Sequence, residues 1–128
     1  MVLARIISIL PAILLIPVGI GWILNPAETS VDFGFVFNEL SKLAQNTLIR
    51  DLTGFFLGIS TMCIIGAITM KYIWLAAPAV IFLFVLLGHT IAAIIYGTGF
   101  ADVFFPEVLL FILCSLAAYL IYRQDKSN

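Results

Sequence analysis

One apolar stretch decides the fold of this chain: residues 73–96, with the sequence IWLAAPAVIFLFVLLGHTIAAIIY. The hydrocarbon core of a membrane is about 30 Å thick, and about 20 helical residues cross it. This stretch is long enough and contains no Asp, Glu, Lys or Arg. Because lipid offers the backbone no hydrogen-bond partners, a single segment at this depth satisfies its polar groups as a helix. We therefore predict a transmembrane helix over residues 73–96.

Three further apolar stretches flank it, at residues 2–24, 47–70 and 103–122. The composition agrees, since 63% of the residues are hydrophobic, 10% are charged and the mean hydropathy is +1.20. Soluble domains carry roughly 25% charged residues. The sequence therefore predicts an all-α integral membrane protein, in which residues 1–128 form a single four-helix bundle.

Basic residues predict the orientation of these helices, because Lys and Arg accumulate on the cytoplasmic side of a membrane. Four of them fall on one side of the predicted bundle and two on the other: Arg5, Lys71, Arg123 and Lys126 against Lys42 and Arg50. We expect both termini in the cytoplasm and a multi-pass membrane protein. Residues 25–46 then form the one long outer loop.

That loop has two features of its own. Asn25-Pro26-Ala27-Glu28 has the order of an N-cap, a first-turn proline and an N3 acid, which predicts a short helix. The rest is too apolar for a free linker: it contains Phe33, Phe35, Val36, Phe37 and Leu40. Two alternatives stay open, a segment lying on the membrane surface and a lid over the bundle.

The charged residues inside the apolar stretches are the candidate functional residues, because charge in a bilayer is costly and rare. Arg50 and Asp51 open the second stretch, His89 lies in the third and Glu107 lies near the start of the fourth. At 100° per residue, Arg50 and Asp51 share a helix face with Gly54 and Gly58, which we expect to point into the bundle. Gly54-Phe-Phe-Leu-Gly58 is also a G-x-x-x-G motif for close helix packing.

We expect these groups to meet near the outer face. The predicted pair is Arg50 with Glu107, since a guanidinium binds a carboxylate through two parallel hydrogen bonds. Asp51 either binds the first-loop backbone or competes for Arg50. His89 would form the floor of the site, with Tyr96 above it.

Each group also has a purely structural interpretation. Arg50 and Asp51 can mark a helix end, with the arginine reaching to lipid headgroups. Glu107 can be an exposed first-turn acid that the helix dipole favours. His89 can be a neutral histidine bonded to a neighbouring helix.

Other classes of site have little support in the sequence. No nucleophile-and-base motif predicts a catalytic residue. One histidine with distant acids lacks the spacing of a metal site, so we predict no metal and no cofactor. The net charge of −1 and the lack of a basic run argue against nucleic-acid binding.

Several short motifs carry a resemblance to a known family: Leu24-Asn25-Pro26, Phe33-Gly34, and Asn46-Thr-Leu-Ile-Arg50-Asp51 leading into Gly54-Phe55-Phe56. With these, nearly the whole chain resembles the bacterial membrane proteins of domain-of-unknown-function family 4345, which are related to DoxX-like four-helix proteins. The most specific part is Arg50-Asp51 followed by Gly54. The family pattern has a basic residue at the position of His89 and an acid at that of Glu107. The resemblance implies a four-helix inner-membrane protein and no particular activity.

Three functions follow from this interpretation. The first is a non-catalytic protein whose outward-facing pocket binds a membrane lipid or a small lipophilic molecule, through Arg50, Asp51, His89, Tyr96 and Glu107. The second is an accessory subunit of a larger membrane complex, or a homo-oligomer, which docks through Gly54 and Gly58. The third is a membrane enzyme that moves a proton with His89 and Glu107.

Overall fold

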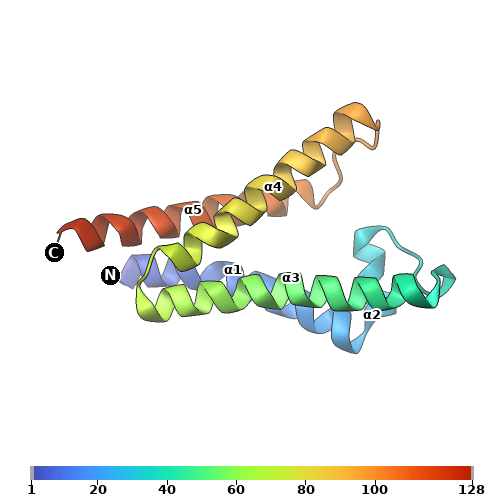
Figure 1. The fold of residues 1–128 in the computed structure, drawn as a ribbon, viewed down its shortest axis with the longest axis horizontal. Helices are drawn as coiled ribbons and strands as arrows, with labels where there is room; N and C mark the ends of the chain where they lie inside the picture. Colours follow the sequence, from blue (N-terminus) through green and yellow to red (C-terminus); the bar gives the residue numbers. More distant parts are fainter. Residues whose placement is uncertain (1, 128) are drawn as a thin grey trace. The chain divides into compact units, whose positions relative to one another are not determined.

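A computed structural model describes residues 2–127 of the chain, the side chain of residue 127 excepted. Its elements, in chain order, are α1 (Val2–Leu24), α2 (Pro26–Thr29), the 3-10 helices η1 (Ser30–Phe33) and η2 (Phe37–Glu39), α3 (Lys42–Thr69), α4 (Ile73–Ile95) and α5 (Phe104–Ser127) (Figure 1). Among the described residues, α1, α3, α4 and α5 are long and apolar enough to cross a membrane. The prediction of an all-α protein with four helices that are long and apolar enough to span a membrane is confirmed for the described residues.

Hydropathy predicts the first and last residues of some of the four helices more closely than those of others. α1 has the predicted bounds and α4 ends one residue early, whereas α3 begins at Lys42 rather than at residue 47. The extra turn is polar, so a prediction from apolar stretches does not include it in the helix. It is helical because Ser41 caps it: the Ala44 N–H donates a hydrogen bond to Ser41 Oγ at 3.2 Å.

The chain divides into two compact units, Met1–Pro11 with Met62–Asn128 and Ala12–Thr61. We call them the hairpin unit and the loop unit, and each is described by itself. The hairpin unit contains α4 and α5, and the loop unit contains the segment between α1 and α3. The prediction of a single domain stays a prediction.

In the hairpin unit, α4 and α5 pack against each other as an antiparallel pair. At one end the ring of Tyr72 meets that of Tyr122 edge-on at 5.3 Å. At the other end His89 meets Glu107. The buried residues of the two helices are Leu75, Pro78, Ala79 and Phe82 in α4, and Leu110, Cys114, Ala117 and Ile121 in α5.

The turn between α3 and α4 is short and tightly packed. Met70 directly follows α3 and has a left-handed conformation with φ 53°. Its N–H donates a hydrogen bond to the Gly66 carbonyl at 2.9 Å. Leu75 lies directly over Gly66, where a Cβ atom would overlap the leucine side chain. A glycine is therefore required at position 66 for α3 and α4 to approach as they do.

The loop unit has an aromatic core. Trp22 is fully buried, and its ring contacts Phe33 at 5.4 Å, which in turn contacts Phe56 at 5.7 Å. Gly19 lets Leu57 pack closely against α1, since a Cβ atom there would lie 2.6 Å from Leu57 Cδ2. α1, the loop and α3 thus share one core within this unit.

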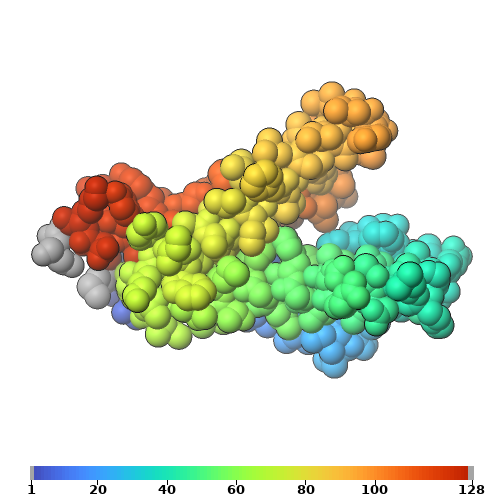
Figure 2. Space-filling model, viewed as in Figure 1, coloured from blue at the N-terminus to red at the C-terminus, as the bar shows by residue number. Residues whose placement is uncertain are grey.

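The predicted short helix at residues 26–29 is present as α2, although Asn25 makes no capping hydrogen bond with its side chain in the described structure. The turns after it are held by side chains. Ser30 Oγ donates to the Ala27 carbonyl at 2.9 Å, and Gln45 Nε2 donates to the carbonyls of Phe37 and Leu40. These turns, in cyan, therefore lie against the start of α3 (Figure 2).

Candidate functional site

Two polar pairs carry the predicted site residues, and they lie in different units. His89 and Glu107 belong to the hairpin unit, whereas Arg50 and Asp51 belong to the loop unit. The hydrogen bonds of each pair are internal to its unit.

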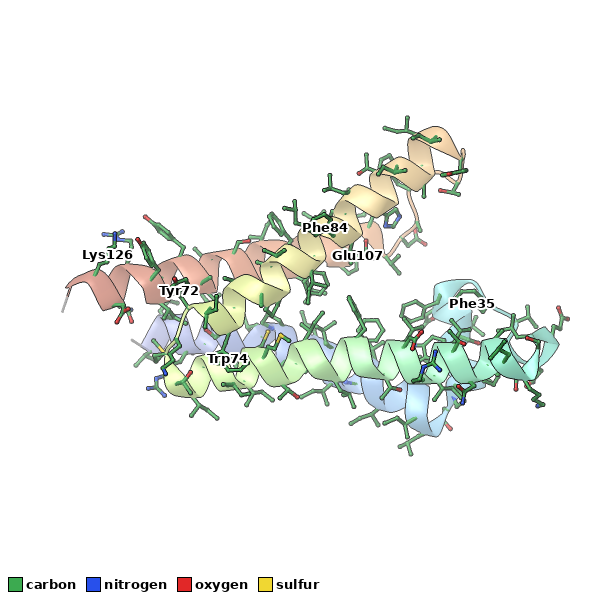
Figure 3. The ribbon with its side chains drawn as sticks, in the orientation of Figure 1. Phe35, Tyr72, Trp74, Phe84, Glu107 and Lys126 are labelled. Atoms are coloured by element: carbon green, nitrogen blue, oxygen red, sulfur yellow. The ribbon has the colours of Figure 1, made fainter. Side chains whose placement is uncertain are left out.

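The first pair joins α4 to α5. Glu107 lies in the first turn of α5, on the side that faces α4 (Figure 3). Its Oε2 atom is 2.8 Å from His89 Nδ1, and the side chains are 13% (His89) and 21% (Glu107) exposed. Little water therefore reaches this contact.

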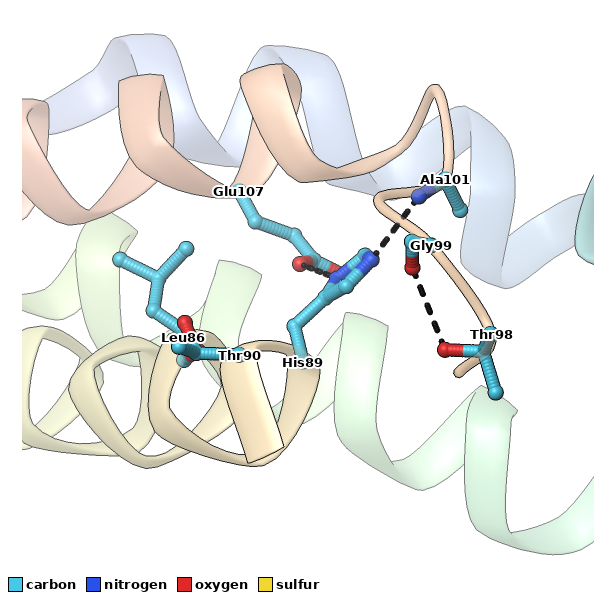
Figure 4. A network of polar contacts seen from close by, with 7 residues as sticks. All are labelled: Leu86, His89, Thr90, Thr98, Gly99, Ala101 and Glu107. Atoms are coloured by element: carbon cyan, nitrogen blue, oxygen red, sulfur yellow. Dashed lines mark hydrogen bonds and ion pairs between the residues drawn. The ribbon is translucent and has the colours of Figure 1, made fainter. Parts of the chain in front are cut away.

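The second ring nitrogen of the histidine is occupied as well. The Ala101 N–H donates a hydrogen bond to His89 Nε2 at 3.2 Å (Figure 4). A backbone N–H can only donate, so Nε2 is an acceptor and carries no proton. The ring proton then lies on Nδ1 and is donated to the Glu107 carboxylate. The geometry assigns His89 as the neutral Nδ1–H tautomer.

Two phenylalanines enclose the imidazole. Phe100 is stacked on it with ring centroids 6.2 Å apart and an interplanar angle of 16°, and Phe104 meets it edge-on at 5.2 Å. Phe100 and Phe104 contact each other at 4.9 Å. Phe100 and the Ala101 amide belong to the connection between α4 and α5, and Phe104 is the first residue of α5. His89 therefore fixes this connection to α4.

This arrangement limits the chemistry of His89. A histidine needs a free ring nitrogen to act as a general base or to bind a metal ion. Both nitrogens are engaged here, one by a carboxylate and the other by a backbone amide. Within residues 2–127, no group of three or more His, Cys, Asp or Glu side chains is placed to hold a metal ion.

The second pair lies on α3. Arg50 Nε donates to Asp51 Oδ1 at 2.7 Å, and Arg50 Nη2 lies 3.5 Å from Asp51 Oδ2. The side chains are 63% and 57% exposed. Competition of Asp51 for Arg50, one of the two predicted alternatives, is therefore what the structure describes. The pairing of Arg50 with Glu107 stays a prediction, because each has its described partner inside its own unit.

The glycines below this pair are open. No atom of the loop unit lies within 4 Å of the position that a Cβ atom would occupy on Gly54 or Gly58. The interior face of α3 carries Phe56, Ile59 and Ser60 instead. Within the loop unit Arg50, Asp51 and Gly54 are exposed. The expected direction of the Arg50–Gly54 face into the bundle stays a prediction.

Tyr96 was expected above His89 but lies at the end of α4, where it is 78% exposed. Among the described contacts, none joins it to His89 or Glu107. The residues that do contact the imidazole, Ala101, Phe100 and Phe104, were missed. A sequence pattern does not predict which backbone amide will bind a side chain. The three phenylalanines at positions 100, 104 and 105 do indicate an aromatic cluster.

The loop unit also has a surface groove of about 330 Å³, which α2 and the turns after it form. Its lining is mostly apolar and consists of Ala27, Val31, Gly34, Phe35, Val36, Phe37 and Asn38. No family model, curated protein or solved structure was found to match the chain.

Proposed function

We propose that this chain is a non-catalytic membrane protein that binds a lipid or another lipophilic molecule through the outer half of α3. One observation carries the proposal: the charged pair Arg50–Asp51 is exposed on a helix that is otherwise suited to lipid. Charge in contact with hydrocarbon is costly, so such a pair requires a polar partner. A lipid headgroup is the polar partner that a membrane supplies at this surface.

The length of α3 supports a position of the pair at headgroup level. Its 28 residues extend about 42 Å as a helix. That is about 12 Å more than the hydrocarbon core. With Thr69 level with one boundary, the other boundary falls close to Arg50. The polar turn from Lys42 to Gln45 then lies among the headgroups.

The segment between α1 and α3 supports the same location. It connects two spans and is only about 17 residues long, so it stays close to the membrane. Val31 and Val36 are 68% and 62% exposed, beside the apolar groove. Exposed apolar groups of this kind are stabilised where headgroups meet acyl chains. We place this segment on the membrane surface.

The distribution of basic residues supports an orientation with both termini in the cytoplasm of a bacterial cell. The Arg50–Asp51 pair and the groove then belong to the outer leaflet of the inner membrane. His89 and Glu107 fix the hairpin unit in this proposal and do not contact the ligand.

Native mass spectrometry of the protein in mild detergent tests binding. We expect the wild-type chain to retain adducts with the mass of a lipid or small lipophilic molecule, and the double variant R50Q/D51N to lose most of them. The matched control E39Q/K42Q also removes one acid and one base from the loop unit, and it should keep the adducts. A bare wild-type chain, or equal adducts on R50Q/D51N, would contradict the proposal.

A second function is favoured by the open face at Gly54 and Gly58. A helix of another protein could pack there, which would make the chain an accessory subunit. Photo-cross-linking from Thr61 in native membranes separates the two functions. A single hetero-partner supports the subunit, whereas lipid adducts or self-contacts alone exclude it.

Proton-transfer catalysis is the third candidate, because His89 and Glu107 are hydrogen-bonded. It needs the connection between α4 and α5 to release Nε2. Substrate turnover that disappears in His89→Ala, with the fold retained, would be required to support it.

A further inference from the structure

We infer that the Arg50–Asp51 pair selects zwitterionic lipids whose headgroup joins a phosphate to a primary ammonium, as in phosphatidylethanolamine. This inference rests on the proposed lipid binding and adds the class of headgroup. It follows from three properties of the pair: its unused hydrogen-bonding capacity, its zero net charge and the shape of the helix face below it.

Both members of the pair can bind a further partner. Arg50 uses Nε and one Nη2 contact on Asp51, but a guanidinium has five N–H donors. Asp51 accepts one short bond at Oδ1 and a long one at Oδ2, and a carboxylate has about four acceptor sites. With more than half of each side chain exposed, these remaining donors and acceptors face outward.

The charges of the pair discriminate between headgroups. A lone arginine would attract any phosphate, and anionic lipids most strongly. Here Asp51 lies 2.7 Å from the guanidinium, so a headgroup on Arg50 also meets a carboxylate. An anionic headgroup is repelled by that carboxylate. A phosphate–ammonium headgroup instead gives each charge an opposite partner, the phosphate on Arg50 and the ammonium on Asp51.

A primary ammonium fits Asp51 better than a quaternary one. It has N–H groups that donate charge-assisted hydrogen bonds to a carboxylate, as a lysine ammonium does. A choline headgroup carries methyl groups in their place and offers only electrostatic attraction. The pair therefore distinguishes ethanolamine from choline by hydrogen bonding.

The surface below the pair suits an acyl chain. Gly54 and Gly58 follow on the same face of α3, one and two turns toward the membrane centre. Nothing in the loop unit covers them within 4 Å. A headgroup on Arg50 and Asp51 thus has two uncovered glycines beneath it, along which one chain of the lipid can lie.

Lipid titration of the purified protein in mild detergent tests the selectivity. Phosphatidylethanolamine, phosphatidylcholine and phosphatidylglycerol with identical acyl chains are added separately, and thermal unfolding and native mass spectra are recorded. We expect apparent affinity for phosphatidylethanolamine to exceed that for each of the other two by about tenfold, the effect of one charge-assisted hydrogen bond.

The variants assign the selectivity to the pair. Asp51→Asn removes the carboxylate charge, so its preferred lipid should become phosphatidylglycerol. Arg50→Gln should weaken all three lipids, and E39Q/K42Q should keep the wild-type order. Asp51→Asn is isosteric and Arg50→Gln shortens the side chain, but both positions are exposed. Circular dichroism checks that the helices remain.

Failure of the inference and failure of the proposed function give different results. Equal affinity for the three lipids, or a wild-type preference for phosphatidylglycerol, overturns the headgroup selectivity and leaves lipid binding intact. The absence of any shift or adduct with all three lipids contradicts lipid binding itself.

Discussion

His89 differs from the other polar residues of the spans in where its partners lie. Five hydroxyl side chains bond to the carbonyl four residues earlier in their own helix: Ser8, Ser60, Thr61, Thr69 and Thr90. Such bonds satisfy a hydroxyl in lipid and leave little for another helix or an ion. His89 instead links α4 to Glu107 on α5 and to the Ala101 amide.

His89→Ala should release the connection between α4 and α5. The Ala101 N–H loses its acceptor, and a hydrogen bond of this kind contributes about 1 kcal/mol, so its exchange with deuterium should accelerate roughly fivefold. Hydrogen exchange followed by mass spectrometry of the peptide containing Ala101 measures this.

Thr98→Ala is the matched control, because the Thr98 hydroxyl bonds only the neighbouring Gly99 carbonyl in the same connection. It should leave the protection of Ala101 unchanged. Equal exchange in the wild type and His89→Ala would contradict the described hydrogen bond. So would nitrogen NMR shifts that place the ring proton of His89 on Nε2.

At the scale of the elements, the turn between α3 and α4 combines a strained residue with a close contact. Met70 has φ 53°, a conformation that costs an L-residue roughly 1–2 kcal/mol. Glycine adopts it without that cost and is the common residue at this position after a helix. The contact of Leu75 with Gly66 holds the turn in place nonetheless.

Met70→Gly should therefore stabilise the chain by about 0.5–1 kcal/mol, although the methionine side chain is lost. The midpoint of SDS-induced unfolding in mixed micelles measures the change. Met70→Ala is the control, since it loses the same side chain but keeps a Cβ atom in the left-handed conformation. An M70G chain no more stable than M70A would show that this backbone strain has no effect on stability.

The elements also show what sequence patterns can and cannot predict. Hydropathy located the spans because twenty apolar residues in a row have few alternatives. It missed the first turn of α3, where Lys42 and Gln45 are polar but helical. Periodicity grouped Arg50, Asp51 and Gly54 on one face of α3, and the direction of that face into the bundle stays a prediction. The depth of His89 and Glu107 followed from residue counting, but their pairing depended on a connection whose backbone the sequence does not describe.

At the scale of the whole molecule, the orientation in the membrane is a prediction from the distribution of charge. Lys71 and Lys126 flank spans on the predicted cytoplasmic side, and Glu39 lies in the long segment on the other side. The native cysteines, Cys63 and Cys114, are buried inside helices. We therefore expect them to react little with a labelling reagent.

Single-cysteine variants test this orientation in intact cells with a membrane-impermeant maleimide. Glu39→Cys should be labelled, whereas Lys71→Cys and Lys126→Cys should react only after lysis. The wild-type chain is the control and should react in neither case. Labelling of Lys71→Cys in intact cells would contradict cytoplasmic termini.

The turn at Met70 has a consequence for biogenesis. Only Met70, Lys71 and Tyr72 separate α3 from α4. This connection is too short for one span to insert into the bilayer while the other stays outside it. We therefore expect the two to enter the bilayer together as a helical hairpin. α4 is the more apolar of the two, so its partition into lipid helps to draw in α3, the span that carries an arginine and an aspartate.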